Sequence, residues 1–172
     1  MKTIKGFTLI ELLVVSVIIL TFSGIILAQY NQQTQQLKFK NEAKKMIDIM
    51  ELARKKAITS DLIPTPNVTP PTFCTDFTGY QFILKTNSSY SLNYCCNSSC
   101  ITVLNTYNLD SKIVITSPVA LPDSLVFTPL MKVFNRNFTS ITLKNTVLNK
   151  CLVISISPIG VIELDENLTD CL

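Results

Sequence analysis

A long apolar run near the N-terminus constrains this chain more than any other feature of its sequence. The run extends from Phe7 to Ala28, and Glu11 is the one charged residue within it. Its 22 residues would form about 33 Å of helix, which matches a bilayer hydrocarbon core of roughly 30 Å. We therefore expect a membrane-spanning helix over residues 7–28.

A short basic leader precedes the apolar run. Lys2 and Lys5 lie before it, so the positive-inside bias predicts a single-pass protein with a cytoplasmic N-terminus and a head outside or in the periplasm. In a secretory signal the small-residue cleavage site follows the apolar region, whereas here the small residue, Gly6, comes first. Cleavage after Gly6 would remove residues 1–6 and leave the apolar helix on the mature chain.

Glu11 is a candidate functional residue because of its place in the run. An ionised carboxylate deep in lipid costs about 2.5–3.5 kcal/mol on insertion scales, and such a residue is normally functional and paired. We therefore expect a cation as its partner. The alternative is a lone acid in a generic signal anchor.

Residues 5–13 read Lys-Gly-Phe-Thr-Leu-Ile-Glu-Leu-Leu, and this segment closely resembles the signal of type IV prepilins. The resemblance implies that prepilin peptidase cuts between Gly6 and Phe7 and that Phe7 is then N-methylated. It also implies that Glu11 pairs with the N-terminal amine of a neighbouring subunit and so sets the register of assembly.

The polar sequence after Ala28 is expected to continue the same helix. Residues 29–60 contain neither Gly nor Pro, so we predict one helix over residues 7–60, with an amphipathic second half. The apolar positions that recur at three- and four-residue steps are Leu37, Ala43, Met46, Ile47, Met50, Ala53 and Ala57. The cations at 54–56 are interpreted as a solvated face or a complement to the helix dipole, with a phosphate or lipid contact as the alternative.

A proline-rich linker over residues 61–76 is predicted to end the helix, since four prolines lie within residues 64–71. Beyond it the hydrophobic period changes to two, which indicates strands. We expect strands at 80–85, 90–95, 101–104, 112–116, 125–128, 132–134, 140–144, 152–157 and 161–164. The predicted fold class is α+β, with the helix packed on an antiparallel β head of residues 77–172, as in pilins.

The cysteines indicate disulfides, because all of them follow the membrane run and lie on its oxidising side. They are Cys74, Cys95, Cys96, Cys100, Cys151 and Cys171. We favour a Cys151–Cys171 bond that clips the C-terminal tail, and we expect the vicinal Cys95 and Cys96 to pair separately. Zinc at Cys95, Cys96 and Cys100 is the weaker alternative, since their spacing is not a paired C-x2-C.

The residue content argues against catalysis. The chain has no histidine, and its glycines at 6, 24, 79 and 160 form no phosphate-binding loop. We predict no enzyme activity, no cofactor and no metal. The acids Glu163, Asp165, Glu166 and Asp170 are interpreted as a solvated edge, with calcium as the alternative. Residues 61–172 carry six basic and eight acidic side chains, which argues against nucleic-acid binding.

The helix end at 46–58 and the segments 125–129, 140–143 and 152–157 resemble the H-type minor pseudopilins and the FimT-like minor pilins. A glycine common in that group after Phe-x-Pro is absent here, where Leu130 and Met131 follow Pro129.

This resemblance implies a minor pilin or pseudopilin that is held in the bacterial inner membrane and then packed by its N-terminal helix into a type IV pilus or a type II secretion pseudopilus. Its implied partners are prepilin peptidase, other pilins or pseudopilins, the inner-membrane assembly platform and membrane lipid. The alternatives are a pilus-borne adhesin or DNA-uptake subunit that uses the loops around Cys74 and Cys95–Cys100, and a signal-anchored exported domain.

Overall fold

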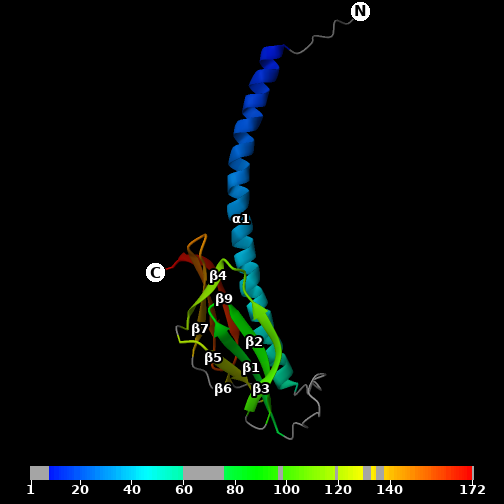
Figure 1. The fold of residues 1–172 in the computed structure, drawn as a ribbon, viewed down its shortest axis with the longest axis vertical. Coiled ribbons are helices and arrows are strands. Elements are labelled where there is room, and N and C mark those ends of the chain that lie inside the picture. Colours follow the sequence, from blue (N-terminus) through cyan, green and yellow to red (C-terminus); the bar gives the residue numbers. More distant parts are fainter. Residues whose placement is uncertain are drawn as a thin grey trace, which may run out of the picture. The chain divides into compact units, whose positions relative to one another are not determined.

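The computed structural model of the 172-residue chain describes residues 8–59, 76–96, 99–118, 120–129, 133–134 and 138–171. The predicted linker at 61–76 lies outside these residues except for Asp76. The chain divides into two units, residues 1–38 and residues 39–172. One helix, α1 (Leu9–Ile58), contributes to both, and nine strands follow it in the second unit, which we call the head (Figure 1).

The strands form two antiparallel sheets. Their bounds are β1 (Phe77–Thr86), β2 (Ser89–Cys96), β3 (Ser99–Asn108), β4 (Ile113–Ser117), β5 (Asp123–Phe127), β6 (Val133–Phe134), β7 (Ser140–Asn145), β8 (Lys150–Ile156) and β9 (Ile162–Asp170). The five-stranded sheet has the order β3-β2-β1-β5-β6, and the four-stranded sheet has the order β4-β7-β8-β9. Every predicted strand overlaps one of these, so the α+β fold class is confirmed.

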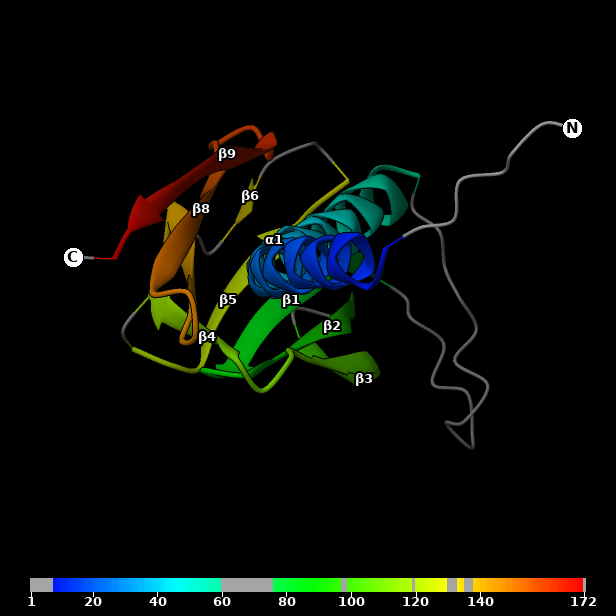
Figure 2. The same ribbon diagram turned by 90° about the horizontal axis from the view of Figure 1, so that it is seen from above.

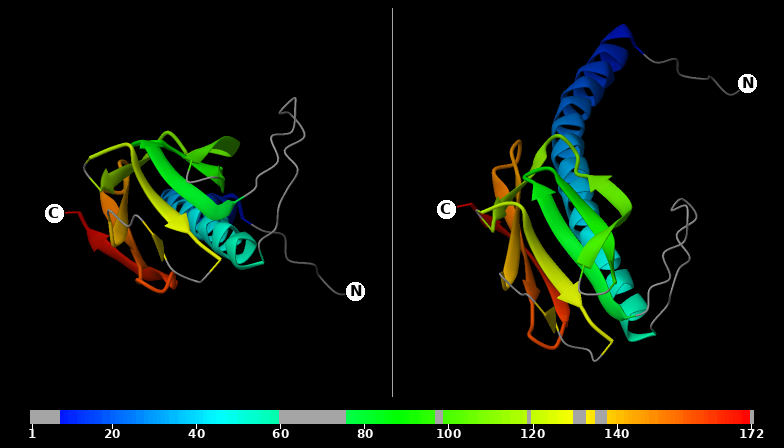
Figure 3. Two further views of the ribbon diagram at one scale, coloured as in Figure 1. Left: turned by 90° about the horizontal axis from the view of Figure 1, so that it is seen from below. Right: turned by 60° about the horizontal axis from the view of Figure 1, so that its bottom comes forward.

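The head encloses one hydrophobic core between α1 and the sheets (Figures 2 and 3). Strand alternation places Tyr80, Phe82 and Leu84 of β1 in it, because every second residue of a strand points to the same face. The helix contributes the fully buried side chains of Phe39, Ala43, Met46, Met50, Ala53 and Ala57.

The predicted core face of the helix was wrong at its first position. Leu37 is 62% exposed, whereas Phe39 is fully buried. At 100° per residue, Phe39 lies about 40° from Ala43 around the helix axis, while Leu37 lies about 120° away. Ile47, also placed on this face, is half-buried at its margin.

Tyr90 is a fully buried tyrosine whose ring stacks on Tyr107 at a centroid distance of 5.2 Å. Burial raises the pKa of its hydroxyl strongly, and the charges of Glu42 and Tyr107 raise it further. Among the described residues this hydroxyl has no hydrogen-bond partner. Ionisation of Tyr90 is therefore opposed by the folded head and not by the unfolded chain.

We expect the head to lose stability as the pH rises above about 10, the ordinary tyrosine pKa. Above that pH the unfolded chain loses the Tyr90 proton while the folded chain keeps it, which costs about 1.4 kcal/mol per pH unit. Urea unfolding of the full chain in detergent between pH 8 and 11 measures this loss. Tyr90→Phe should have the same free energy of unfolding as the parent at pH 8 and should lose less of it at pH 11. Equal losses of unfolding free energy in both proteins would contradict the prediction.

Candidate assembly site

The start of α1 is fixed by a reciprocal capping arrangement. Glu11 Oε2 accepts two hydrogen bonds from Thr8, one from the backbone N–H and one from the hydroxyl, both 2.9 Å long. In return, the Glu11 backbone N–H donates to Thr8 Oγ1 at 3.3 Å. This is the S/T-x-x-E capping box, with Thr8 as the N-cap and Glu11 at the third helical position.

The capping box gives Glu11 a role inside its own helix that our sequence analysis missed. The Thr-x-x-Glu pattern, with Glu11 three residues after Thr8, was the available signal. The bonds involve Oε2, and no donor among the described residues reaches the other carboxylate oxygen, Oε1. Gly6, Phe7, Lys2 and Lys5 lie outside the described residues, so the structure does not place the predicted cleavage site relative to Glu11.

The first half of α1 exposes an apolar surface all round. Its large exposed side chains from residue 9 to residue 22 are Leu9, Ile10, Leu12, Leu13, Val14, Val15, Val17, Ile18, Ile19, Leu20 and Phe22. Within the described part of the chain, α1 is the one helix long and apolar enough to cross a membrane. A surface of this kind fits either lipid or the helices of other subunits.

The hydroxyl groups in this apolar half are bonded to the helix itself. Ser16 donates to the carbonyl of Leu13 at 2.8 Å, and Thr21 donates to the carbonyl of Ile18 at 2.8 Å. Ser23 donates to the carbonyl of Ile19 at 2.7 Å. These polar side chains therefore need no partner from water, which lowers the cost of placing the helix in lipid.

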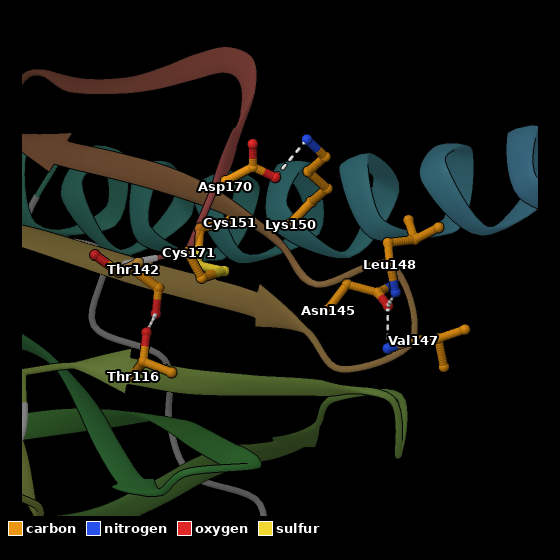
Figure 4. The surroundings of a disulfide bond; sticks show 9 residues. All are labelled: Thr116, Thr142, Asn145, Val147, Leu148, Lys150, Cys151, Asp170 and Cys171. Carbon is orange, nitrogen blue, oxygen red and sulfur yellow. Dashed lines mark hydrogen bonds and ion pairs between the residues drawn. A yellow bond between two sulfur atoms is a disulfide. The ribbon is translucent and has the colours of Figure 1, made fainter.

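Disulfides hold two parts of the head. Cys95 is bonded to Cys100 across the β2–β3 connection, and Cys151 is bonded to Cys171, the pairing favoured from the sequence (Figure 4). Cys96 also lies in a disulfide, so the vicinal cysteines do pair separately. Cys74 lies outside the described residues. Because Cys95, Cys96 and Cys100 are all oxidised, no thiolate of this set is left for zinc.

The C-terminal acids have partners of other kinds. Glu166 pairs with Lys44 of α1 at 3.3 Å, and Asp170 pairs with Lys150 at 2.7 Å. Asp165 accepts hydrogen bonds from the backbone and side chain of Asn167, both at 3.0 Å. In the described ranges, no group of three or more His, Cys, Asp or Glu residues is placed to hold a metal ion.

Comparisons with known proteins give results for both parts of the chain. Residues 1–27 match the family model described as the prokaryotic N-terminal methylation motif. Two crystal forms of the type IV minor pilin FimU from Pseudomonas aeruginosa are similar in structure, with TM-scores of 0.51 and 0.52 and identities of 14% and 13%. Each covers 76% of this chain, which in turn covers 96% and 91% of theirs. No curated protein sequence matches the chain. The structural likeness at these identities shows a shared fold.

Proposed function

We propose that this chain, which carries a prepilin-like N-terminal methylation motif on the fold of a type IV minor pilin, is a minor pilin that packs into a filament through α1. It is a structural subunit and not an enzyme. The observation that carries this proposal is the methylation motif over residues 1–27, which contains the capped start of a helix with an exposed apolar surface.

In this proposal prepilin peptidase cuts between Gly6 and Phe7, and Phe7 receives the methyl group. Before assembly the subunit stays in the bacterial inner membrane, with the first half of α1 in lipid and the head on the outer side. The assembly platform then transfers it to a filament, where other pilins replace lipid around α1. The fold shared with FimU makes the type IV pilus the first machine to test, ahead of the type II secretion pseudopilus.

Glu11 supports the proposal through its geometry. The capping box uses Oε2 of Glu11. Oε1 accepts no hydrogen bond from the described residues, so it is available to a donor from elsewhere. The N-terminal amine of a neighbouring subunit, displaced along the filament axis, would supply that donor together with a positive charge. Pairing of this kind would neutralise the carboxylate that is costly in lipid, which favours transfer of α1 from lipid into the filament.

The test is the intact mass of the full chain, purified from membranes of cells with and without prepilin peptidase. With the peptidase we expect the mass of residues 7–172 plus one methyl group, and without it the mass of residues 1–172. Gly6→Val should block trimming, while Gly24→Ala, a change in another glycine of the same segment, should leave it intact. A chain that still begins at Met1 when the peptidase is present would overturn the proposal in favour of a signal-anchored exported domain.

A further inference from the structure

The last strand of the head, β9, is interrupted by a bulge near the C-terminal disulfide. Val153 of β8 lies opposite Asp165, whereas Cys151 lies opposite Thr169. The three residues of β9 between these two pairs, 166–168, therefore lie opposite a single residue of β8. A bulge of this kind bends the strand and redirects the side chains within it.

The bulge leaves Asn167 on the surface of the head. Leu168 packs against the core, and Glu166 is held by Lys44 of α1 at 3.3 Å. Asn167, which lies between them, is exposed. Among the described residues β9 has one strand neighbour, β8, and it forms the outer edge of its sheet in Figure 2. Asn167 is therefore open to another molecule from the solvent side.

Asn167 begins the tripeptide Asn-Leu-Thr, which is the acceptor pattern for N-linked glycans. Tripeptides of this pattern begin at residues 67, 87, 97, 137 and 167. Because the chain is rich in Asn, Ser and Thr, the pattern alone has little weight. Asn167 differs from the other four in having an acid, Asp165, two residues before it. The residues at the corresponding place in the others are Thr65, Lys85, Cys95 and Asn135.

Asp165 is in direct contact with the amide group of Asn167. Its Oδ1 accepts hydrogen bonds from the backbone N–H and from the side-chain Nδ2 of Asn167, both at 3.0 Å. An amide nitrogen is a weak nucleophile because its lone pair is delocalised into the carbonyl group. A carboxylate that accepts a hydrogen bond from this nitrogen increases the electron density on it and fixes its orientation. At this one asparagine, exposure and an activating contact therefore coincide.

We propose that Asn167 accepts an N-linked glycan from a polyprenyl-pyrophosphate-linked oligosaccharide, through a membrane oligosaccharyltransferase that acts on the outer side of the membrane. Nδ2 forms a bond to the anomeric carbon of the first sugar, the bond from that carbon to the pyrophosphate oxygen breaks, and polyprenyl pyrophosphate leaves. One amide proton passes to a base of the transferase. Asp165 is a positioning residue in this step. Transfer on this side requires the export of the head, which is part of the function proposed above.

A glycan at this position would cover the free edge of β9. An edge strand offers unpaired backbone N–H and C=O groups to other chains, and bulges and charged side chains hinder such pairing. A bulky, hydrated group on Asn167 would add to the bulge and to the acids of β9. It would thereby keep this edge of the head from pairing with strands of other exported proteins.

The test is peptide mapping by mass spectrometry of the full chain, purified from the membranes of its own cells. The peptide that contains Asn167 should carry a mass increase equal to a whole number of sugar residues, with fragment ions that place it on the Asn167 side chain. Asn167→Gln should remove this increase. An unmodified Asn167 in the parent chain would overturn the proposal, as would an increase that persists in Asn167→Gln or sugar attached to the Thr169 hydroxyl.

Substitutions at two neighbouring acids test the role of Asp165. Asp165→Asn keeps a side-chain oxygen that accepts from Asn167 but removes the charge, so the ratio of modified to unmodified chain should fall about tenfold. Asp165→Glu should restore most of that ratio. Glu166→Gln removes one charge from the same bulge without a change at the amide of Asn167, and it should leave the ratio unchanged. Equal losses in Asp165→Asn and Glu166→Gln would contradict the positioning role.

Asn87 is the matched control asparagine. It is exposed in the β1–β2 turn and begins Asn-Ser-Ser, but Lys85 occupies the place of the acid. We expect it to stay unmodified. Equal modification of Asn87 and Asn167 would show that exposure is sufficient and would overturn the role given to Asp165.

The N-terminal peptide in the same map reports separately on the proposed function. Trimming to Phe7 without sugar on Asn167 would overturn the glycan and leave the pilin proposal in place. Sugar on Asn167 in a chain that still begins at Met1 would support the glycan and overturn processing by prepilin peptidase.

Discussion

Replacing Glu11 by alanine should leave the protein in the membrane and reduce its incorporation into filaments by a factor of about 30 or more. Loss of one partner from a buried, hydrogen-bonded charge pair costs about 2–5 kcal/mol, and each 1.4 kcal/mol is tenfold. Insertion should persist because removal of a carboxylate makes the apolar run more hydrophobic. The measurement is the ratio of this subunit in sheared filaments to that in membranes, by quantitative immunoblot against the parent chain.

Glu11→Gln separates the capping role that the structure shows for this residue from the charge pairing that we propose for it. Glutamine keeps the capping box, since its side-chain oxygen still accepts from Thr8, but it lacks the charge that an amine would neutralise. If charge pairing drives assembly, Glu11→Gln should fail almost as completely as Glu11→Ala. If capping is what matters, Glu11→Gln should assemble normally and Thr8→Ala should fail. Normal incorporation of Glu11→Ala itself would exclude both roles.

Gly79→Ala is expected to destabilise the head strongly. Gly79 lies in β1 with a φ of 147°, a conformation that side chains rarely adopt. An added Cβ would also overlap the backbone carbonyl oxygen of Phe127 on β5. Backbone strain and forced displacement each cost about 1–3 kcal/mol, so we expect a loss of about 2–4 kcal/mol and a fall of roughly 10 °C in Tm.

Gly24→Ala provides the control with the same chemical change. Its added Cβ has no atom within 4 Å, and alanine is about 1 kcal/mol better than glycine in a helix interior. The thermal transition of the head, followed by limited proteolysis of the full chain in detergent, should therefore stay unchanged. If Gly79→Ala and the parent had the same thermal transition, β1 and β5 could move apart without loss of stability. That result would contradict the close pairing of the two strands, in which Tyr80 lies opposite Phe127.

The fold was predictable where hydrophobic pattern and local chemistry agree. The apolar run and the period of α1 predicted a continuous helix, and the β-branched and aromatic runs predicted all nine strands. The prediction was too short at β9, which extends to Asp170, because Asp165 to Asn167 are polar and exposed on an edge strand. Backbone pairing with β8, in which Lys150 lies opposite Asp170, extends β9 through residues that show no apolar pattern.

The candidate site was less predictable because its contacts depend on how the segments meet in space. Glu11 was identified from its cost in lipid, but the bonds to Thr8 require the helix to begin at Leu9, which propensity alone does not fix. Six cysteines allow fifteen pairings, and sequence reasoning favours only the clip at Cys151 and Cys171. The Cys95–Cys100 bond follows from the β2–β3 pairing, which brings Cys96 opposite Ser99.

The serine and threonine hydroxyls of α1 have a consequence for reversibility. Because Ser16, Thr21 and Ser23 donate to carbonyls of their own helix, these three hydroxyls have no hydrogen bond to exchange when the surroundings of the apolar half of α1 change from lipid to protein. The two states then differ in what covers the apolar side chains and in how Glu11 is neutralised. The proposed ion pair of Glu11 would then determine whether the subunit stays in the membrane or enters a filament. A filament that disassembles would return the subunit to the membrane in a form that can assemble again.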